Sequence, residues 1–193
     1  MRFAKSTPIL VAWVVSWMAA MSPAEEIVAP ENKLKSAFLY NFALFTKWPT
    51  NAFASADAPL VIGVLGQDPF GATLDDTVKG KTAGNRPIVV QRFRRVDDIK
   101  SCHVLFISQS EKGWLDETLA TLDGRSILTV SDLSGFCQQR GMIRLFPAKH
   151  PDKKGAYNIK FEICPETAAA VQLTLSSKML RLAEIICPPK EGR

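Results

Sequence analysis

The sequence predicts an α/β fold: a mostly parallel sheet in the strand order 2-1-3-4, with helices on both faces, an antiparallel C-terminal hairpin and helices at both ends. The first observation behind this prediction is a series of apolar runs that alternate with helical segments, at residues 60–65, 87–90, 104–107 and 127–130. Continuous apolar runs are typical of strands covered on both faces, and strand–helix alternation is typical of parallel sheets. The second is a pair of segments, 142–146 and 157–163, that alternate apolar and polar residues around a polar turn, as in a hairpin that extends one edge of the sheet.

The helices are predicted from their end signals. Asn32 can cap a helix that runs to about Lys47 and is stopped by Pro49. The later helices are expected at 68–78, with Asp68 and Pro69 as its first residues, at 111–122 after Ser110, at 134–139 before Gly141, and at 165–186, where Thr174, Ser176 and Ser177 are positions of bending or breakage.

The first helix is apolar around much of its circumference. Leu34, Phe38, Phe42 and Phe45 form one stripe at helical spacing, and Tyr40 and Leu44 are among the residues that widen it. An ordinary surface helix shows a single stripe, so this helix is covered on two sides, either by its own fold or by a second chain. The candidate partner-binding residues are Phe38, Tyr40, Phe42 and Trp48, some of which must serve the core.

The amino terminus predicts export. Arg2 and Lys5 precede an apolar run over 9–21, and Ser22-Pro23-Ala24 offers small residues before Glu25. We expect a signal peptide at 1–24, a single mature domain at 25–193 and a periplasmic location without membrane insertion after cleavage. The alternative is an uncleaved membrane anchor, although thirteen residues are few for a bilayer span.

The charge of the mature chain is modest. The full chain has 24 basic and 19 acidic residues, so removal of Arg2 and Lys5 leaves 22 against 19, a net charge of +3. No run of Lys and Arg is long enough to suggest nucleic acid as a partner.

The four cysteines, Cys102, Cys137, Cys164 and Cys187, all follow the signal peptide. An even count in an oxidising compartment predicts two disulfides, and spacing alone leaves three connectivities open. The predicted hairpin favours Cys137–Cys164 with Cys102–Cys187, and the main alternative is Cys164–Cys187. No C-x-x-C motif occurs, and no metal site is expected because the adjacent Cys102 and His103 would face opposite sides of a strand.

A ligand crevice is predicted where the parallel strands end, since open α/β sheets bind ligands at this point. The candidate residues are Gly66, Asp68, Ser108, Ser110, Ser131 and Asp132. The alternative is structural, because Asp68, Ser110 and Ser131 would also serve as helix N-caps.

Motifs for catalysis are missing from the sequence. Gly63, Gly66 and Gly71 do not have dinucleotide-binding spacing, and there is no P-loop and no G-x-S-x-G nucleophile elbow. Neither histidine has a nucleophile or carboxylate partner by spacing. We therefore expect no enzymatic activity and no cofactor.

Several short strings occur in order along the mature chain. They are 35–42 (KSAFLYNF), Trp48-Pro49, 64–71 (VLGQDPFG), 102–108 (CHVLFIS), 128–132 (LTVSD), Gly135-Phe136, 141–143 (GMI), 160–163 (KFEI) and 175–183 (LSSKMLRLA). Together they resemble the YfiR-like family of periplasmic proteins over nearly the whole mature chain. Two departures are Cys164, where members commonly carry Asn, and a longer loop at His150 to Lys154.

This resemblance implies a function. YfiR-like proteins repress inner-membrane diguanylate cyclases by holding the periplasmic sensor domain of the cyclase inactive, which keeps cyclic-di-GMP low. The family also implies a homodimer and a redox-sensitive fold. The competing hypotheses are a periplasmic small-molecule binding protein that uses the strand-end crevice and, third, a hydrolase.

Overall fold

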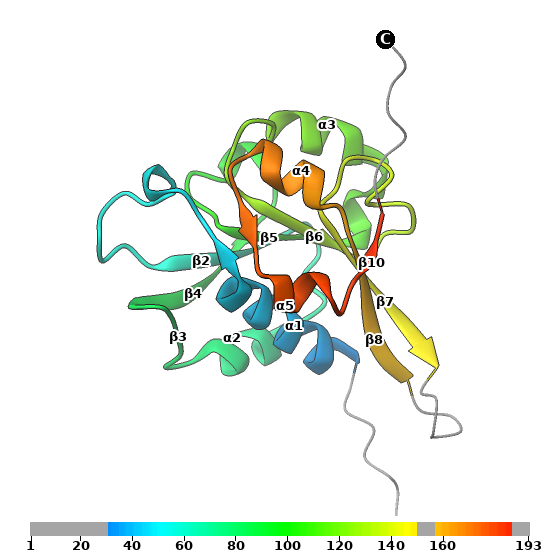
Figure 1. The fold of residues 1–193 in the computed structure, drawn as a ribbon, viewed down its shortest axis with the longest axis horizontal. Coiled ribbons are helices and arrows are strands. Elements are labelled where there is room, and N and C mark those ends of the chain that lie inside the picture. Colours follow the sequence, from blue (N-terminus) through cyan, green and yellow to red (C-terminus); the bar gives the residue numbers. More distant parts are fainter. Residues whose placement is uncertain (1–30, 150–156, 187–193) are drawn as a thin grey trace, which may run out of the picture.

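The computed structural model describes residues 31–149 and 157–186 (Figure 1). The predicted signal peptide at 1–24, the loop at His150 to Lys154 and Cys187 lie outside these residues.

A mixed eight-stranded sheet forms the centre of the molecule, in the order β10-β8-β7-β6-β5-β2-β4-β3 (Figure 1). Its parallel strands are β2 (Leu60–Leu65), β4 (Arg86–Phe93), β5 (Val104–Ile107) and β6 (Leu128–Ser131). Their order β4-β2-β5-β6 confirms the predicted order 2-1-3-4.

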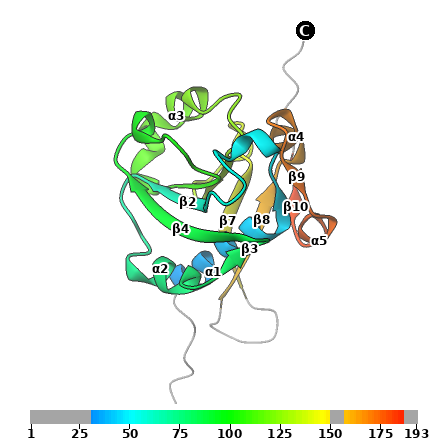
Figure 2. The same ribbon diagram turned by 90° about the vertical axis from the view of Figure 1, so that its left-hand side faces the viewer.

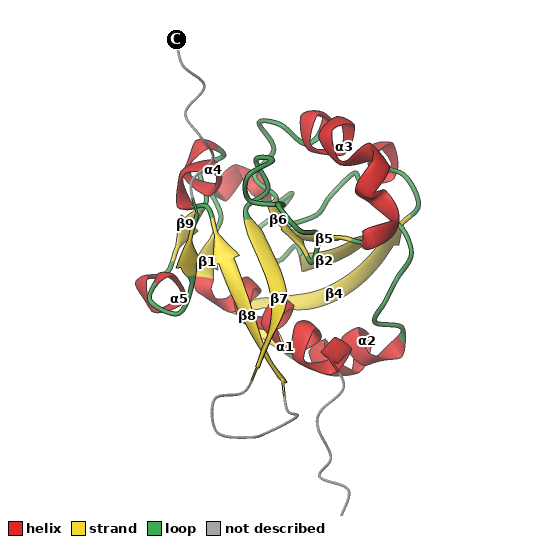
Figure 3. Ribbon diagram, turned by 90° about the vertical axis from the view of Figure 1, so that its right-hand side faces the viewer, coloured by secondary structure: helices red, strands yellow, loops and turns green. Residues whose placement is uncertain are grey.

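The predicted hairpin is also confirmed. It consists of β7 (Ile143–Lys149) and β8 (Tyr157–Ile163), which pair antiparallel, and β7 pairs parallel with β6 at the sheet edge (Figure 3). Two short strands, β3 (Thr82–Ala83) beside β4 and β10 (Glu184–Ile185) beside β8, lengthen the sheet beyond the prediction.

Helices cover both faces of the sheet, as predicted. Helices α1 (Glu31–Phe45) and α2 (Ala72–Val78) lie on one side, whereas the 3₁₀ helix η3 (Gln109–Trp114) and α3 (Leu115–Thr121) lie on the other (Figure 2). Alternate residues of each strand supply the two cores. Val64 and Phe106 join the core under α1, and their neighbours Leu65 and Ile107 join the core under α3.

Two predicted helix starts and one predicted helix are wrong. Helix α2 begins at Ala72 with Gly71 as its N-cap, because Asp68 instead accepts the Phe70 N–H (2.7 Å) and forms a tight turn. The segment after Ser108 begins as η3 rather than as an α-helix capped by Ser110. Residues 134–140 form turns rather than a helix.

The predicted C-terminal helix at 165–186 is wrong as a single element. It is divided into α4 (Pro165–Ala170), β9 (Thr174–Leu175), α5 (Ser177–Leu180) and β10. Gln172 takes a left-handed conformation (φ 63°), and β9 pairs with β1 (Thr46–Lys47), which directly follows α1. The first break therefore precedes the predicted positions, whereas the second falls on them, and Ser176 caps α5 by accepting the Lys178 N–H. Two further 3₁₀ helices are η1 (Thr50–Ala52) and η2 (Val96–Asp98).

Candidate functional site

The ends of β2, β5 and β6 surround a hollow of about 190 Å³, at the place predicted for the crevice. Its lining residues are Gln67, Asp68, Pro69, Phe106, Ser108, Gln109, Ser110 and Asp132. Four of the six predicted residues therefore line it directly, and Gly66 and Ser131 are not among the lining residues. None of Asp68, Ser110 and Ser131 caps a helix through its side chain, so the helix-cap alternative is wrong for these residues.

The hydroxyl groups of the crevice are bound to each other. Ser110 Oγ accepts the Gln67 N–H (2.9 Å) and donates to Glu111 Oε1 (2.8 Å). Because a hydroxyl has one proton, the 2.8 Å contact between Ser108 and Ser110 must be a donation from Ser108. Gly66 fits against this group at φ 85°, and a Cβ at position 66 would overlap the Ser110 hydroxyl. These hydroxyls are therefore committed to holding the strand ends together.

A buried ion pair connects the crevice to α1. Lys35 Nζ lies 2.6 Å from Asp132 Oδ2 and 2.6 Å from Glu31 Oε1, and Gln109 Nε2 donates to Asp132 Oδ1 (2.9 Å). Burial alone would lower the pKa of Lys35, but its hydrogen bonds to Asp132 and Glu31 raise that pKa above the ordinary value of 10.5. The ammonium is thus held charged and fixes α1 to the end of β6.

Asp68, which lines the crevice, is held by Arg92. Arg92 Nε lies 2.7 Å from Asp68 Oδ2, and its Nη2 lies 2.5 Å from Asp75 Oδ2. The hydrogen bonds to Arg92 lower the pKa of Asp75 below 3.8, so this carboxylate stays ionised. The ion pairs join β4 to the start of α2.

The predicted partner-binding aromatic residues pack mainly on their own fold. Phe42 is 1% exposed, and the rings of Phe38 and Phe42 lie 5.7 and 5.3 Å from that of Phe161. Tyr40 is half-buried under Lys81, whose Nζ lies 4.4 Å from the ring centroid. Trp48 is half-buried and donates from Nε1 to the carbonyl of His103 (3.3 Å).

Exposed apolar side chains occur at other positions. Leu44 and Phe45 are exposed at the end of α1, and Leu182 and Ile185 are exposed in the C-terminal segment that packs beside α1. Sequence reasoning placed Leu44 and Phe45 in the apolar surface of the first helix but did not select them. It missed Leu182 because this residue was assigned to the interior of a long helix.

Comparison with known proteins supports a family assignment. The model of the YfiR/HmsC-like family matches residues 32–184, from the start of α1 to β10. The chain belongs to the YfiR/HmsC-like family. Members of this family are periplasmic regulators rather than enzymes, in agreement with the resemblance seen in the sequence. No curated protein matches the chain.

No helix in the described part of this YfiR/HmsC-like chain has the length and apolar character needed to cross a membrane. Within residues 31–149 and 157–186, no three His, Cys, Asp or Glu side chains come together as a metal site.

A buried histidine cluster anchors the segment after α1 in this YfiR/HmsC-like fold. His103 Nδ1 accepts the Val61 N–H (3.0 Å), so the ring proton lies on Nε2 and is donated to the Ala52 carbonyl (3.2 Å). The ring stacks on Phe53 at 4.3 Å, and the Arg86 guanidinium covers the other face of Phe53 at 3.7 Å. Burial, with a contribution from the Arg86 charge, lowers the pKa of His103.

Three cysteines lie in the described part of the chain, and each is a buried free thiol. Cys137 Sγ lies 3.7 Å from the Met142 carbonyl, which also accepts the Cys164 N–H (2.8 Å). Cys164 Sγ lies 2.9 Å from Thr167 Oγ1. Burial raises the pKa of Cys102 and of Cys137 to about 12, so neither thiol is reactive at neutral pH while it stays buried.

Proposed function

We propose that the mature chain is a periplasmic repressor that binds the sensor domain of an inner-membrane diguanylate cyclase and keeps cyclic-di-GMP low. The observation that carries this proposal is the match to the YfiR/HmsC-like family over residues 32–184, which includes every helix and nearly every strand described above. The repressor acts by binding and performs no chemistry.

The hydrogen bonding of the crevice is structural. A nucleophilic serine is commonly activated by a histidine, but Ser108 donates to Ser110, and Ser110 donates to Glu111 while it accepts the Gln67 N–H. His103, the histidine of the described residues, is held by backbone groups at both ring nitrogens. These groups stabilise the strand ends and the loop after α1.

Repression requires a preference for one state of the cyclase. A ligand with equal affinity for two states shifts neither, and near-complete silencing needs a preference of about 5.5 kcal/mol for the inactive state. A protein interface of ordinary size, about 800 Å² on each partner, can supply such a preference.

Deletion of the gene tests this function in the cell. We expect cyclic-di-GMP and biofilm formation to rise in a deletion strain that expresses the cyclase, and to return to their original levels when the gene is restored. A strain that lacks both the gene and the cyclase is the matched control, in which deletion has no effect. Unchanged cyclic-di-GMP in the single deletion would contradict the repressor function.

We further propose that the periplasmic form carries a disulfide, with Cys164–Cys187 as the pairing that the fold favours. Ile186, the residue before Cys187, donates its N–H to the Ile163 carbonyl (2.9 Å), one residue before Cys164. Pairing of Cys187 with Cys102 is disfavoured, because three strands at about 4.8 Å spacing separate β5 from β10. A disulfide joins Cα atoms at most about 7 Å apart.

This pairing makes a specific redox prediction. Peptide mapping of the exported protein without reductant should recover a Cys164–Cys187 peptide, with Cys102 and Cys137 as thiols. Reductant should lower stability by about 3 kcal/mol, the chain-entropy value for a loop of this length. Cys164→Ser is the control, because reductant should not affect its melting temperature. Recovery of a Cys137–Cys164 peptide would instead support the pairing expected from the hairpin.

The second candidate function is small-molecule binding in the crevice, and the hollow of about 190 Å³ favours it. The existing hydrogen bonds weigh against it, since the protons of the Ser108 and Ser110 hydroxyls are already donated and Ser110 also accepts two bonds, so that a ligand would have to displace them. A homodimer, which the family resemblance implies, is tested by light scattering of the purified mature protein.

A further inference from the structure

The outer side of α1 differs from that of an ordinary surface helix. Surface helices carry charged residues toward solvent, but the exposed positions of α1 after its first turn are Asn41, Leu44 and Phe45. Phe45 is 38% exposed even though it is a large aromatic residue. The fold therefore buries the inner side of this helix and leaves an apolar outer side uncovered.

The C-terminal segment continues this exposed apolar surface. Helix α5 contacts α1, and the Ser176 N–H donates to the Phe45 carbonyl (2.9 Å), which sets α5 directly beside the end of α1. Leu182, just after α5, is 77% exposed, and Ile185 is exposed on the edge strand β10. We call the surface formed by Phe45, Leu44, α5, Leu182 and Ile185 the α1–α5 face.

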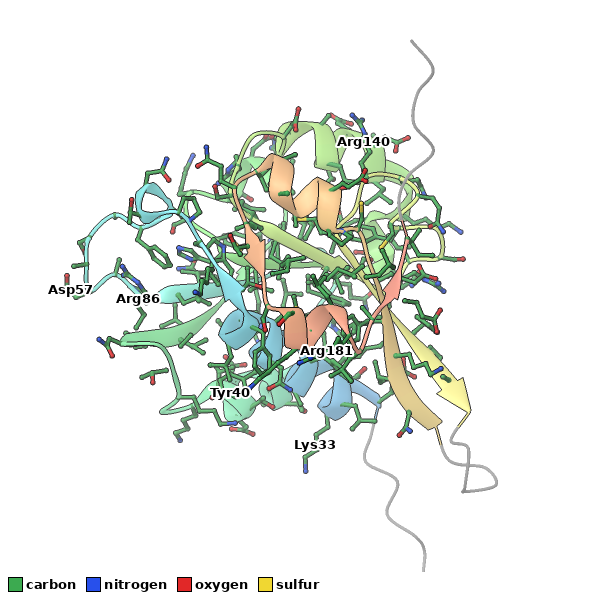
Figure 4. The ribbon with its side chains drawn as sticks, in the orientation of Figure 1. Lys33, Tyr40, Asp57, Arg86, Arg140 and Arg181 are labelled. Carbon is green, nitrogen blue, oxygen red and sulfur yellow. The ribbon has the colours of Figure 1, made fainter. Side chains whose placement is uncertain are left out.

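The charges of the α1–α5 face have one sign. No acidic residue occurs between Glu31 and Asp57, or between Glu166 and Glu184. Apart from the buried Lys35, the cations on these segments have no ion-pair partner among the described residues, and they are Lys33, Lys47, Lys178 and Arg181. Figure 4 shows Lys33 and Arg181 with Tyr40 on this side of the molecule. The two carboxylates at its border, Glu31 and Glu184, face Lys35 and Lys160.

We propose that the α1–α5 face is the docking surface for a protein partner whose complementary surface has an apolar centre bordered by carboxylates. This inference rests on the proposed function and specifies the chemistry of the cyclase surface that the repressor would recognise. Leu182 and Phe45 supply the apolar anchors, and Lys178 and Arg181 pair with the carboxylates around them. Exposed apolar surface framed by charge is typical of protein interaction sites.

The charge argues against a second copy of the chain as the occupant. A two-fold dimer through this face would bring the same patch of each copy together, so that Lys178 and Arg181 would oppose the cations of the other copy. Like charges in an interface without compensating carboxylates oppose association. A partner with carboxylates at these positions would instead form ion pairs with Lys178 and Arg181.

Binding of the purified periplasmic domain of the cyclase to the mature protein tests this proposal by calorimetry. We expect Leu182→Glu and Arg181→Glu each to weaken binding by about tenfold or more. Leu182→Lys also loses the apolar anchor but keeps the sign of the surface charge, so it should weaken binding clearly less than Leu182→Glu does. Moderate salt should weaken the wild-type complex, because exposed charges are screened beyond about 8 Å at 0.15 M. Leu182 and Arg181 are exposed, so each variant should keep the wild-type melting temperature.

Matched controls lie elsewhere on the surface. Trp114 is an exposed aromatic residue on η3, and Lys100 is an exposed cation near the loop that follows α3. Trp114→Ala and Lys100→Glu should both bind the domain within about twofold of wild type. Equal effects of Leu182→Glu and Leu182→Lys, or a loss with Trp114→Ala alone, would overturn the proposed surface.

Other results separate this inference from the proposed function. If the wild-type protein binds the domain and all variants bind equally well, the function stands and the α1–α5 face is wrong as its docking surface. If the wild-type protein does not bind the domain, the function fails and the inference fails with it. A dimer that Leu182→Glu makes monomeric, or sedimentation with phosphatidylglycerol vesicles that Leu182→Glu abolishes, would identify another occupant and overturn the inference.

Discussion

The inner and outer sides of α1 carry similar residues but have different fates in the fold. On the inner side, Leu39 and Phe42 are fully buried in the main core, and Lys35 is buried with its charge paired to Asp132. On the outer side, Phe45 remains exposed and the cations have no described ion-pair partner. The difference divides the helix into an inner side that the fold requires and an outer side that the docking proposal assigns to a partner.

The largest expected effect compares two phenylalanines of this helix. Phe42→Ala removes a ring packed against Phe161 and should lower the free energy of unfolding by about 3–5 kcal/mol. Phe45→Ala removes an exposed ring and should lower it by less than about 1 kcal/mol. Urea denaturation of both variants measures the difference. Similar losses would show that Phe45 also serves the core and would remove it from the docking surface.

An intermediate effect is expected at the buried ion pair of the inner side. Asp132→Asn leaves the Lys35 ammonium with Glu31 as its remaining described carboxylate and should destabilise the fold by about 2–3 kcal/mol. The double variant Lys35→Met/Asp132→Asn removes both charges of the pair and should cost less, because apolar or neutral groups of similar volume often replace buried ion pairs without loss. Thermal unfolding of the single and double variants at pH 7.5 measures the order. A larger loss for the double variant would mean that attraction within the pair exceeds the cost of burying it.

The same contrast explains what the sequence could predict. The strand order and the hairpin follow from local apolar patterns. In 60–163, strands with continuous apolar runs are covered by helices on both faces, and the alternating strands form the hairpin. The division of 165–186 depends on the pairing of β9 with β1, which lies more than a hundred residues earlier in the chain. Local helix propensity cannot predict a pairing between segments so far apart. Asp68 and Ser110 are residue types that often cap helices. In the structure their side chains bind tertiary partners instead: Asp68 pairs with Arg92, and Ser110 accepts the Gln67 N–H.

The candidate site shows the same limit. The crevice residues were predictable because strand ends meet at one edge of a parallel sheet. The hydrogen bonds among their side chains were not predictable, because these bonds depend on Gly66, at the end of β2, lying against Ser108 and Ser110, at the end of β5. The apolar excess of the first helix was visible in the sequence, whereas the side facing solvent was fixed only by the packing of Phe161 against Phe38 and Phe42.

The smallest expected effect concerns the histidine cluster that anchors the chain just after α1. The folded protein lowers the pKa of His103, and Nδ1 accepts the Val61 N–H only while the ring is neutral. The unfolded chain therefore binds a proton more readily, with a pKa near 6.5, and stability falls as pH drops below that value. The loss continues until the pH reaches the lowered folded pKa and then levels off. Above about pH 7.5 this contribution is constant.

Thermal unfolding between pH 7.5 and 5.0 measures the effect, a range that lies above the ordinary pKa of carboxyl groups. The wild-type melting temperature should fall across this range, whereas that of His103→Gln should change less, because glutamine does not titrate. The two proteins should also differ in how firmly the loop is held, since Phe53 stacks on the His103 ring and the Trp48 indole bonds to the His103 carbonyl. The hydrogen-exchange protection factors of Ala52 and Phe53, which correct for the slower intrinsic exchange at low pH, should fall at pH 5.0 in the wild-type protein, and the inner side of α1 should stay protected. Equal pH dependence in the two proteins would assign the acid response to carboxylates instead of His103. Protection of Ala52 and Phe53 should then change no more between pH 7.5 and 5.0 than that of α1.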